Sequence, residues 1–437
     1  MTTPPSGLSS GLALRYGLLA LPLAFAGLPI YIHAPDFYAT QMAVPLAAIG
    51  LVLLVLRIID AVQDPFIGSI SDRFHRQRRW IMLLGLVMLA GGFVMVFHPL
   101  TTMPLVWLAL GIFICTTGFS IVSINYQALG GLWDVSSTAR TRVAGWREGL
   151  GLIGLLTASI TPTLLMQHFT PRAGFALMSL AYLPLLLLIS LIFLGWWRRA
   201  IIMTPAPDAV PLHLADLLRD PWVRCFFSLY LLSAAASSIP AVLVLFFIRD
   251  YLGAEPLTGV FLLLYFLSGV AAMPIWTRVA RMYGKIAAWR YSIFLATATF
   301  VWAFFLAPGE AVAYGVICVL AGMAFGADLA LPPAILADRI AVADHQRAAS
   351  RYYAGLTFLT KAALALATGL ALPILAMVGY QPGMTNTSLA LPMMYALLPC
   401  IMKASAGLLL WRFQARLNQG AIDEKNLSAD ARSRDGA

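Results

Sequence analysis

The sequence has little charge and few cysteines, and it lacks a nucleotide-binding loop. Only 11% of its 437 residues are Asp, Glu, Lys or Arg, less than half the share of an average soluble domain. This scarcity of charge excludes a soluble enzyme and a disordered scaffold. The four cysteines lie far apart in or beside apolar stretches, which excludes a disulfide framework or a zinc site. No G-x-x-x-x-G-K-S/T motif is present, so the chain does not hydrolyse ATP through a P-loop.

A glycine-rich stretch between Gly145 and Gly154 has the spacing of a dinucleotide-binding fingerprint. It lies in an apolar segment with no strand before it, so it does not have the context that such a fingerprint requires. Close packing between helices explains these glycines better. We therefore expect no bound cofactor.

Long apolar runs fill most of the chain. Hydrophobic residues make up 60% of the sequence, and the mean hydropathy is +0.83. A helix of about 20 apolar residues crosses the hydrocarbon core of a bilayer. Runs of this length begin near residues 14, 43, 80, 103, 148, 174, 222, 257, 288, 311, 352 and 389. The sequence predicts an all-α membrane protein with twelve transmembrane helices, the first of them bent at Gly27 and Pro29.

The 29 lysines and arginines are concentrated in alternate connections between these runs. They follow every second span and the last one, whereas the opposite side carries only Arg172 and Arg249. Lys and Arg are retained on the cytoplasmic face during insertion. We therefore expect both termini in the cytoplasm and localisation to a bacterial inner membrane. The net charge of +10 then reflects topology and does not indicate a nucleic-acid partner.

The longest predicted cytoplasmic connection divides the chain into two similar halves. We expect an N-terminal six-helix lobe at residues 1–196, a linker at 197–221, a C-terminal six-helix lobe at 222–412 and a cytoplasmic tail at 413–437. Pro65 and Pro274 occupy equivalent places in the two halves, and a basic loop follows each. Parallel six-helix repeats build one class of secondary transporter, whose solute site lies between the lobes. Such a protein can form its pathway as a monomer.

Charged residues within the apolar runs indicate function, because each costs about 2.5 to 3.5 kcal/mol at a helix centre during insertion. The second run carries Arg57, Asp60 and Asp64. The two carboxylates are four residues apart and therefore lie on one helix face. Where water is scarce, two acids this close share a proton or bind a metal ion, and oxygen ligands suit a hard cation such as sodium. The alternative is an ion pair between Arg57 and Asp60.

Several segments resemble a known family. The string RIIDAVQDPFIGSISDR, from Arg57 to Arg73, closely resembles the second-span signature of the glycoside–pentoside–hexuronide:cation symporters, a melibiose permease-like family within the major facilitator superfamily. Further similar segments are SINYQALGGLWD around Tyr126, ALPPAILAD at 330–338 and the eleventh span with Lys361. The resemblance extends from about Tyr16 to about Arg412. It implies the two-lobed major facilitator fold and cation-coupled symport of a small solute by alternating access, without enzymatic activity.

The resemblance also implies roles for individual residues. Asp60 and Asp64 bind the coupling cation, Na+ or H+, with hydroxyl ligands from Ser120 and Ser123. Solute-binding roles are implied for Arg147, Lys361, Tyr126 and its neighbour Asn125, and coupling or gating roles for Arg57, Lys361, Asp72 and Arg73. A lysine inside the membrane needs an anionic partner. We therefore expect Lys361 to approach the two acids from the other lobe when the cation is absent.

The sequence departs from the family at the sugar site. The acids that hydrogen-bond sugar hydroxyls on spans one and four are replaced by Ala24 and Ser123. Asp328 and Lys403, in spans ten and twelve, have no counterpart in the family. Either they pair with each other as a structural contact, or they line the cavity. In the second case Asp328 is a solute-binding residue, and the cations together give a net positive pocket.

Two classes of solute are compatible with these residues. A small glycoside or a sugar acid follows from the family. Transporters of lysophospholipids share the paired acids and the lysine, so an amphiphilic anion is the alternative. An uncoupled lipid flippase or a permease-like sensor is a further alternative, but two unpaired carboxylates inside the membrane favour coupled symport. The expected partners are thus a small solute, the coupling cation and membrane lipid.

Overall fold

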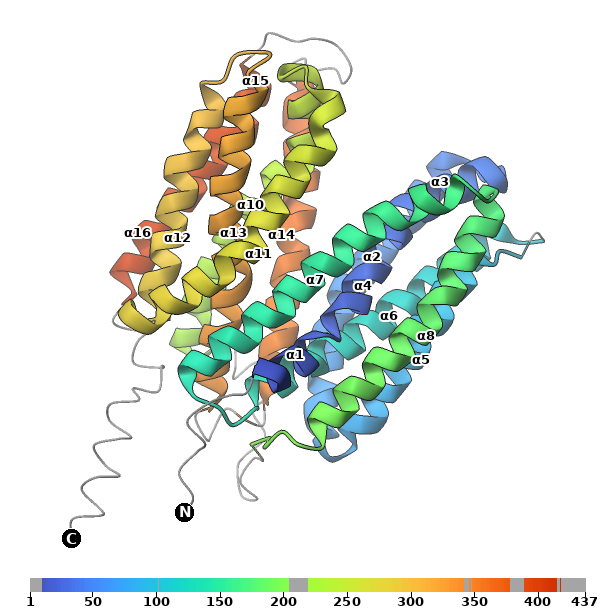
Figure 1. Ribbon diagram of the computed structural model, residues 1–437, viewed down its shortest axis with the longest axis horizontal. Helices are drawn as coiled ribbons and strands as arrows, with labels where there is room; N and C mark the ends of the chain where they lie inside the picture. The colour runs from blue at the N-terminus through green and yellow to red at the C-terminus, as the bar shows by residue number, and fades with distance from the viewer. Residues whose placement is uncertain are drawn as a thin grey trace.

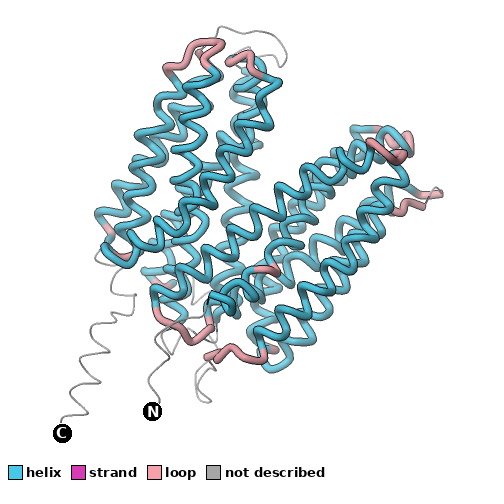
Figure 2. Tube along the Cα trace, in the orientation of Figure 1, coloured by secondary structure: helices cyan, strands magenta, loops and turns pink. Residues whose placement is uncertain are grey.

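A computed structural model describes residues 10–100, 102–203, 219–341, 346, 348–377, 389–414 and 417. Helices account for nearly all of these residues (Figure 2), and a single β-bridge joins Trp133 to Ile202. The described part of the chain is therefore all-α, as the sequence predicts. Most of the linker predicted at 197–221 and of the tail predicted at 413–437 lies outside the described residues.

The helices before residue 204 form one group (Figure 1). They are α1 (Ser10–Gly17), α2 (Ala20–Leu28), α3 (Ala34–Gln41), α4 (Leu46–Arg73), α5 (Arg78–Phe97), α6 (Pro104–Gly131), α7 (Ser137–Met166) and α8 (Pro171–Trp197). A π-helical turn at Pro29–His33 joins α2 to α3. Pro29 has no backbone N–H to donate, so the regular α-helical ladder is interrupted there, beside the bend predicted at Gly27 and Pro29.

The helices after residue 218 form a second group (Figure 1). They are α10 (Pro221–Phe246), α11 (Thr258–Tyr283), α12 (Lys285–Phe300), α13 (Ala311–Ala341), α14 (Ala349–Met377), α15 (Ala390–Pro392) and α16 (Leu398–Arg412). Further π-helical turns at Phe247–Tyr251 and Met393–Leu397 extend α10 and lead into α16.

The outer faces of the helices suit a lipid environment. Ten helices within the described ranges are long and apolar enough to cross a membrane. Two more long helices, α4 with 28 residues and α14 with 29, carry charged residues in their interiors. On α4, Ile58, Val62 and Phe66 are exposed, whereas Asp60 and Asp64 on another face are buried. Apolar residues outside and charged residues inside are the arrangement expected where the surrounding solvent is hydrocarbon.

The two groups contact each other mainly at the end of the molecule where α1 lies (Figure 1). There α4 packs against α14, and α7 packs against α11 and α13. Gly68 on α4 permits the first contact, because a Cβ atom there would lie 2.6 Å from the Cβ of Ala354 and 2.8 Å from the carbonyl oxygen of Ser350. Toward the opposite end the two groups lean apart (Figure 1).

Candidate site for a cation and a solute

Lys361 on α14 reaches across to the paired acids of α4. Its Nζ lies 2.8 Å from Oδ2 of Asp60 and 2.8 Å from Oδ2 of Asp64. It also donates hydrogen bonds to the backbone carbonyl of Asp60, at 3.1 Å, and to the Ser120 hydroxyl on α6, at 3.0 Å. Asp60 is 6% exposed and Asp64 is fully buried. Three helices from both groups therefore meet at one buried charge cluster.

The two carboxylates have different surroundings. Oδ1 of Asp60 accepts hydrogen bonds from the Ser120 hydroxyl, at 3.2 Å, and from the side-chain amide of Gln63, at 3.1 Å. Thr117 in turn donates to Gln63. Asp64 is fully buried, and its partner is the Lys361 ammonium, 2.8 Å from Oδ2, which it shares with Asp60. A buried carboxylate that shares its one cation with a second acid is only partly neutralised, so a further cationic ligand at Asp64 is stabilising.

The charge cluster contains two carboxylates and one ammonium group. With all three ionised, it carries one excess negative charge, because the Lys361 ammonium balances only one acid. A buried excess charge is strongly unfavourable and is relieved by a proton or a counter-ion. The charge count therefore fits one proton or one monovalent cation rather than a divalent metal.

Arg57 is not part of this charge cluster. Its guanidinium lies 5.2 Å from the centre of the Tyr31 ring, and its side chain is exposed. The structure thus pairs Asp60 with Lys361 and not with Arg57, contrary to the alternative that the sequence left open. Arg57 shares the helix face of Asp60 and Asp64, because it precedes them by one and two helical turns.

Arg147 on α7 is neutralised by its own neighbour. Its Nε donates to a carboxylate oxygen of Glu148 at 2.8 Å, and Nη2 contacts the same oxygen. The Arg147 side chain is 8% exposed and that of Glu148 is 25% exposed. Sequence reasoning missed Glu148, although an acid beside an arginine inside an apolar run was the signal that could have identified it. Glu148 thus places a carboxylate beside Arg147 on α7.

Asp328 and Lys403 pair with each other inside the second group. Lys403 Nζ on α16 contacts Oδ2 of Asp328 on α13 and donates to the Ser233 hydroxyl at 2.8 Å. Oδ1 of Asp328 accepts a hydrogen bond from the indole of Trp289 at 3.0 Å. The ionic partners of Lys403, Arg147 and Lys361 are all carboxylates. The net positive pocket considered from the sequence is therefore not formed by these residues.

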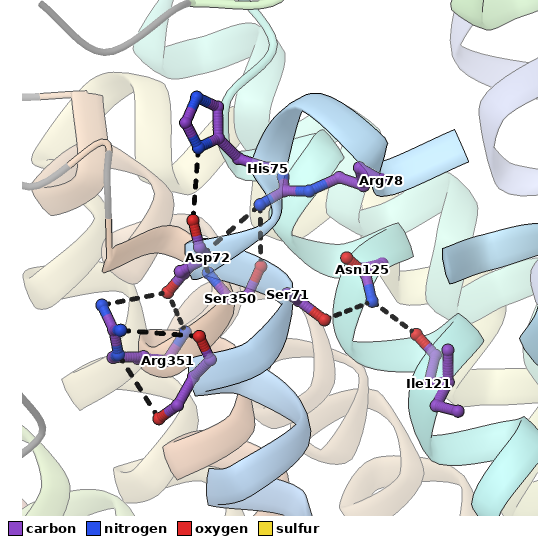
Figure 3. A network of polar contacts seen from close by, with 9 residues as sticks. Ser71, Asp72, His75, Arg78, Ile121, Asn125, Ser350 and Arg351 are labelled. Carbon is purple, nitrogen blue, oxygen red and sulfur yellow. Dashed lines mark hydrogen bonds and ion pairs between the residues drawn. The ribbon is translucent and has the colours of Figure 1, made fainter. Parts of the chain in front are cut away.

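Three other predicted site residues make contacts within the first group. Ser123 accepts a hydrogen bond from the side-chain amide of Gln127 at 3.1 Å. Tyr126 is buried, and its hydroxyl donates to the carbonyl of Tyr16 at 2.9 Å. Asn125, also buried, donates to the Ser71 hydroxyl at 2.9 Å (Figure 3). These contacts join α6 to α1 and α4 and do not bring the three side chains into the charge cluster.

Asp72 joins the two groups at the end where they converge (Figure 3). Its carboxylate accepts hydrogen bonds from the backbone N–H groups of Ser350 and Arg351, both at 2.9 Å, at the start of α14. Arg78 lies 3.4 Å from the same carboxylate and donates to the Ser350 hydroxyl at 2.9 Å. Arg73, predicted to act with Asp72, is exposed beside the Phe74 ring. Arg78 and Arg351 supply the cations of this contact, which we call the Asp72 latch.

A second contact, the Asp338 latch, joins an acid of the second group to a helix start of the first group. Asp338 on α13 accepts hydrogen bonds from Arg140 and Ser137 at the start of α7, both at 3.0 Å. Lys285 lies 2.6 Å from the same carboxylate. In each latch an acid near the end of a helix binds the first turns of a helix in the other group. Negative charge is favourable at a helix N-terminus because the helix dipole is positive there.

Comparisons with known proteins find transporters. The family model described as MFS/sugar transport protein matches residues 14–416. The uncharacterized symporter YjmB of Bacillus subtilis (strain 168) is 23% identical over 386 residues, which cover 84% of this chain and 83% of that protein. The inner membrane symporter YicJ of Escherichia coli (strain K12) is 26% identical over 140 residues, which cover 30% of each chain.

Solved structures resemble this chain over nearly its whole length. A bacterial homologue of the iron transporter ferroportin, in an outward-facing state, aligns with a TM-score of 0.69 and 17% identity over 93% of this chain and 100% of that one. The Escherichia coli fucose:proton symporter FucP aligns with a TM-score of 0.67 and 14% identity over 92% and 97% of the two chains. At such identities the likeness establishes the fold and not the transported substance.

Proposed function

Since the chain belongs to the MFS/sugar transport protein family, we propose that it couples the symport of a small glycoside or sugar acid to one monovalent cation, Na+ or H+. The protein is an integral membrane protein of the bacterial inner membrane, with the all-helical major facilitator fold, and it is a transporter rather than an enzyme. Within this family, the signature from Arg57 to Arg73 supports a place among the glycoside–pentoside–hexuronide:cation symporters.

The proposed topology has twelve spans, namely the ten apolar helices together with α4 and α14. The proposed transporter is a monomer with two lobes, at 1–196 and 222–412, that rock against each other. The linker at 197–221 joins them. Arg78, Arg140 and Lys285 gather at the converging end, which supports a cytoplasmic position for that end. In this orientation the described conformation is closed to the cytoplasm and faces outward.

Asp64 is the observation on which the coupling proposal depends. It is fully buried, it shares Lys361 with Asp60, and it belongs to a charge cluster that has one excess negative charge when all three groups are ionised. A proton or Na+ at Asp60 and Asp64 removes that excess and weakens their hold on Lys361. Because Lys361 comes from the second group, cation occupancy is then linked to the contact between α4 and α14. Ser120, which contacts both Asp60 and Lys361, is the proposed hydroxyl ligand.

The solute is proposed to bind between the groups, next to the charge cluster. Arg147 and Lys361 are the proposed solute contacts, and Glu148 adds a carboxylate that can accept hydrogen bonds from hydroxyl groups. Tyr126 and Asn125 hold α6 in place through their buried hydrogen bonds. A polyhydroxylated solute suits this set because its hydroxyls both donate and accept hydrogen bonds.

An amphiphilic anion has less support as the solute. Its head group requires a cation that is not already neutralised, and Arg147, Lys361 and Lys403 each contact a carboxylate. Arg57, exposed over the Tyr31 ring, is the cation on α4 that such a head group would have to use. Loss of transport of an anion, but not of a neutral glycoside, in Arg57→Gln would favour this alternative.

The first experiment measures thermal stabilisation of the purified protein by sodium, by lithium and by pH. A ligand that binds only the native state raises its stability by mass action, by about 2.7 kcal/mol at 100 times its Kd. We expect sodium to raise the melting temperature of the wild type and to leave Asp64→Asn unchanged. Asp36→Asn is the matched control, because Asp36 is exposed on α3, and it should respond as the wild type does.

The other outcomes of this experiment are equally informative. If metal ions have no effect and stability instead falls as pH rises, the coupling ion is a proton, because deprotonation restores the buried excess charge. A wild type indifferent to metal ions and to pH would refute coupled symport. That result would favour an uncoupled flippase or a permease-like sensor.

A further inference from the structure

The second helix group encloses a cavity of about 220 Å³ that the proposed cation site does not use. Side chains of α10, α11, α12, α13 and α16 line it, and most of them are apolar. Its aromatic members include Phe261, Tyr265, Phe266, Phe300, Phe325 and Tyr395. An engineered apolar cavity of about 150 Å³ binds benzene. This cavity is therefore large enough for one aromatic ring with a substituent.

The rim of the cavity lies between α10 and α11. Ala241 on α10 lines the cavity and is exposed, and Leu262 and Phe266 on α11 are half-buried. Farther along, α11 packs against α7 of the first group, where a Cβ at Gly149 would touch the Met273 side chain at 3.5 Å. The rim is therefore next to the face that the second group turns toward the first.

Tyr230 on α10 connects the cavity with the proposed solute site. Its hydroxyl is hydrogen-bonded to Thr360, the residue before Lys361, at 2.8 Å. Ser233, one turn farther along α10, accepts a hydrogen bond from Lys403 of the cavity wall. Tyr230, Ser237 and Ala241 lie on one face of α10, so the rim of the cavity opens onto the face that also contacts Thr360.

The charged pair in the cavity wall limits what can bind. Asp328 and Lys403 neutralise each other, Trp289 donates a hydrogen bond to Asp328, and Lys403 donates one to the Ser233 hydroxyl. The wall therefore has no net charge to offer an ionic ligand. An apolar ring gains by leaving water, whereas a charged group would lose its hydration without compensation.

We propose that this cavity binds an aromatic group of the transported solute, so that the solute is a glycoside with a neutral aromatic aglycone. The proposal rests on the proposed function for the sugar part and adds the second half of the solute. The sugar hydroxyls contact Glu148, Arg147 and Lys361 between the groups. The aglycone enters the second group past Ala241 and is enclosed by the aromatic side chains of the cavity.

The test compares matched pairs of phenyl and methyl glycosides of glucose, galactose, xylose and glucuronic acid. Their affinities are measured on the purified full-length protein in sodium, by titration calorimetry. Burying a phenyl ring in place of a methyl group should tighten binding of the preferred sugar by about tenfold or more. Equal affinities within every pair that binds would overturn the proposal.

Ala241→Phe tests the location, because the added ring blocks the rim from an exposed position. Leu245→Phe is the control, since Leu245 is exposed one turn farther along α10 and does not line the cavity. We expect Ala241→Phe to lose the phenyl preference and to retain both methyl glycoside binding and the sodium response. Leu245→Phe should behave as the wild type. An undiminished phenyl preference in Ala241→Phe would overturn the proposal.

A second measurement separates failure of this proposal from failure of the proposed function. Ala241→Cys and Leu245→Cys are labelled with a maleimide, with and without benzyl alcohol. Protection at position 241 but not at 245 would support the aromatic site even if no glycoside binds, in which case the sugar part of the proposed function fails. No protection at either position, together with no phenyl preference, would refute the site.

Discussion

At the scale of single residues, Lys361 has the largest expected effect. Its ammonium group lies 2.8 Å from two carboxylates that are almost entirely buried. Removing one partner of a buried ion pair costs about 3–5 kcal/mol, because the remaining charge keeps its desolvation penalty. Here removal of the ammonium would leave two such charges, four residues apart on α4. Their energy must then depend on whatever cation the solution provides.

Lys361→Ala should therefore be destabilised by about 3 kcal/mol or more at neutral pH without sodium. Addition of sodium or a lower pH should restore much of the loss, because a cation or protons replace the missing charge. Thermal melts over a grid of sodium concentration and pH measure this dependence. Lys361→Arg, which keeps the positive charge, is the control. Full cation-driven uptake by Lys361→Ala would contradict the coupling role.

At the scale of elements, the two latches connect helix ends of different groups. Asp72 accepts the backbone N–H groups of Ser350 and Arg351, which are among the donors that the first turn of α14 cannot satisfy within the helix. Asp338 binds Arg140 and Ser137 at the start of α7. Asp72 thus caps α14, whereas Asp338 holds the start of α7 through side chains. The contact between groups and the order of these helix ends are therefore coupled.

Asp72→Asn should loosen the start of α14. A capping side chain contributes about 0.5–2 kcal/mol, so backbone amides at Ser350 and Arg351 should exchange hydrogen up to about thirtyfold faster if local opening limits exchange. Hydrogen–deuterium exchange with mass spectrometry measures this directly. The neighbouring substitution Arg73→Gln is the control, because Arg73 is exposed and outside the latch. Equal exchange in Asp72→Asn and the wild type would show that the cap is dispensable.

At the scale of the whole molecule, the contacts between the two groups are concentrated at one end (Figure 1). The charge cluster, the Asp72 latch and Gly68 lie where α4 meets α14, and the Asp338 latch joins α13 to α7. Alternating access requires that this end separate while the opposite end closes. The balance between the two states therefore depends on how closely α4 can approach α14.

Gly68→Leu should shift this balance toward separation at the converging end, because even a Cβ atom there would meet Ala354 and a backbone carbonyl at less than 3 Å. Distances between pairs of spin labels measure this shift. One pair is placed at Arg76 and Met282 on the converging end, and the other at Met103 and Val312 on the opposite end. The first distance should lengthen and the second should shorten. Gly50→Leu on the same helix is the control, since nothing lies within 4 Å of a Cβ there. Identical distances in Gly68→Leu and the wild type would refute this account.

The sequence by itself determined the features that depend on local pattern. Apolar runs, alternating basic connections and Pro29 predict helices, topology and the break in the first span, because each follows from neighbouring residues and the solvent around them. The four-residue spacing of Asp60 and Asp64 likewise places both acids on one helix face. The family signature then suggested Lys361 as their partner, and the structure shows that contact.

Only the tertiary structure decided which charges neutralise one another. Asp60 and Lys361 are 301 residues apart, and Asp328 and Lys403 are 75 apart, so no spacing rule joins them. The sequence left open whether Asp328 and Lys403 pair or help to form a positive pocket, and the structure shows the pair. Sequence reasoning also left out Glu148, which neutralises Arg147. The complete burial of Asp64 and the aromatic cavity in the second group were also hidden from the sequence. Both arise from how rigid helices pack, because packing determines which polar atoms find partners and which space stays unfilled.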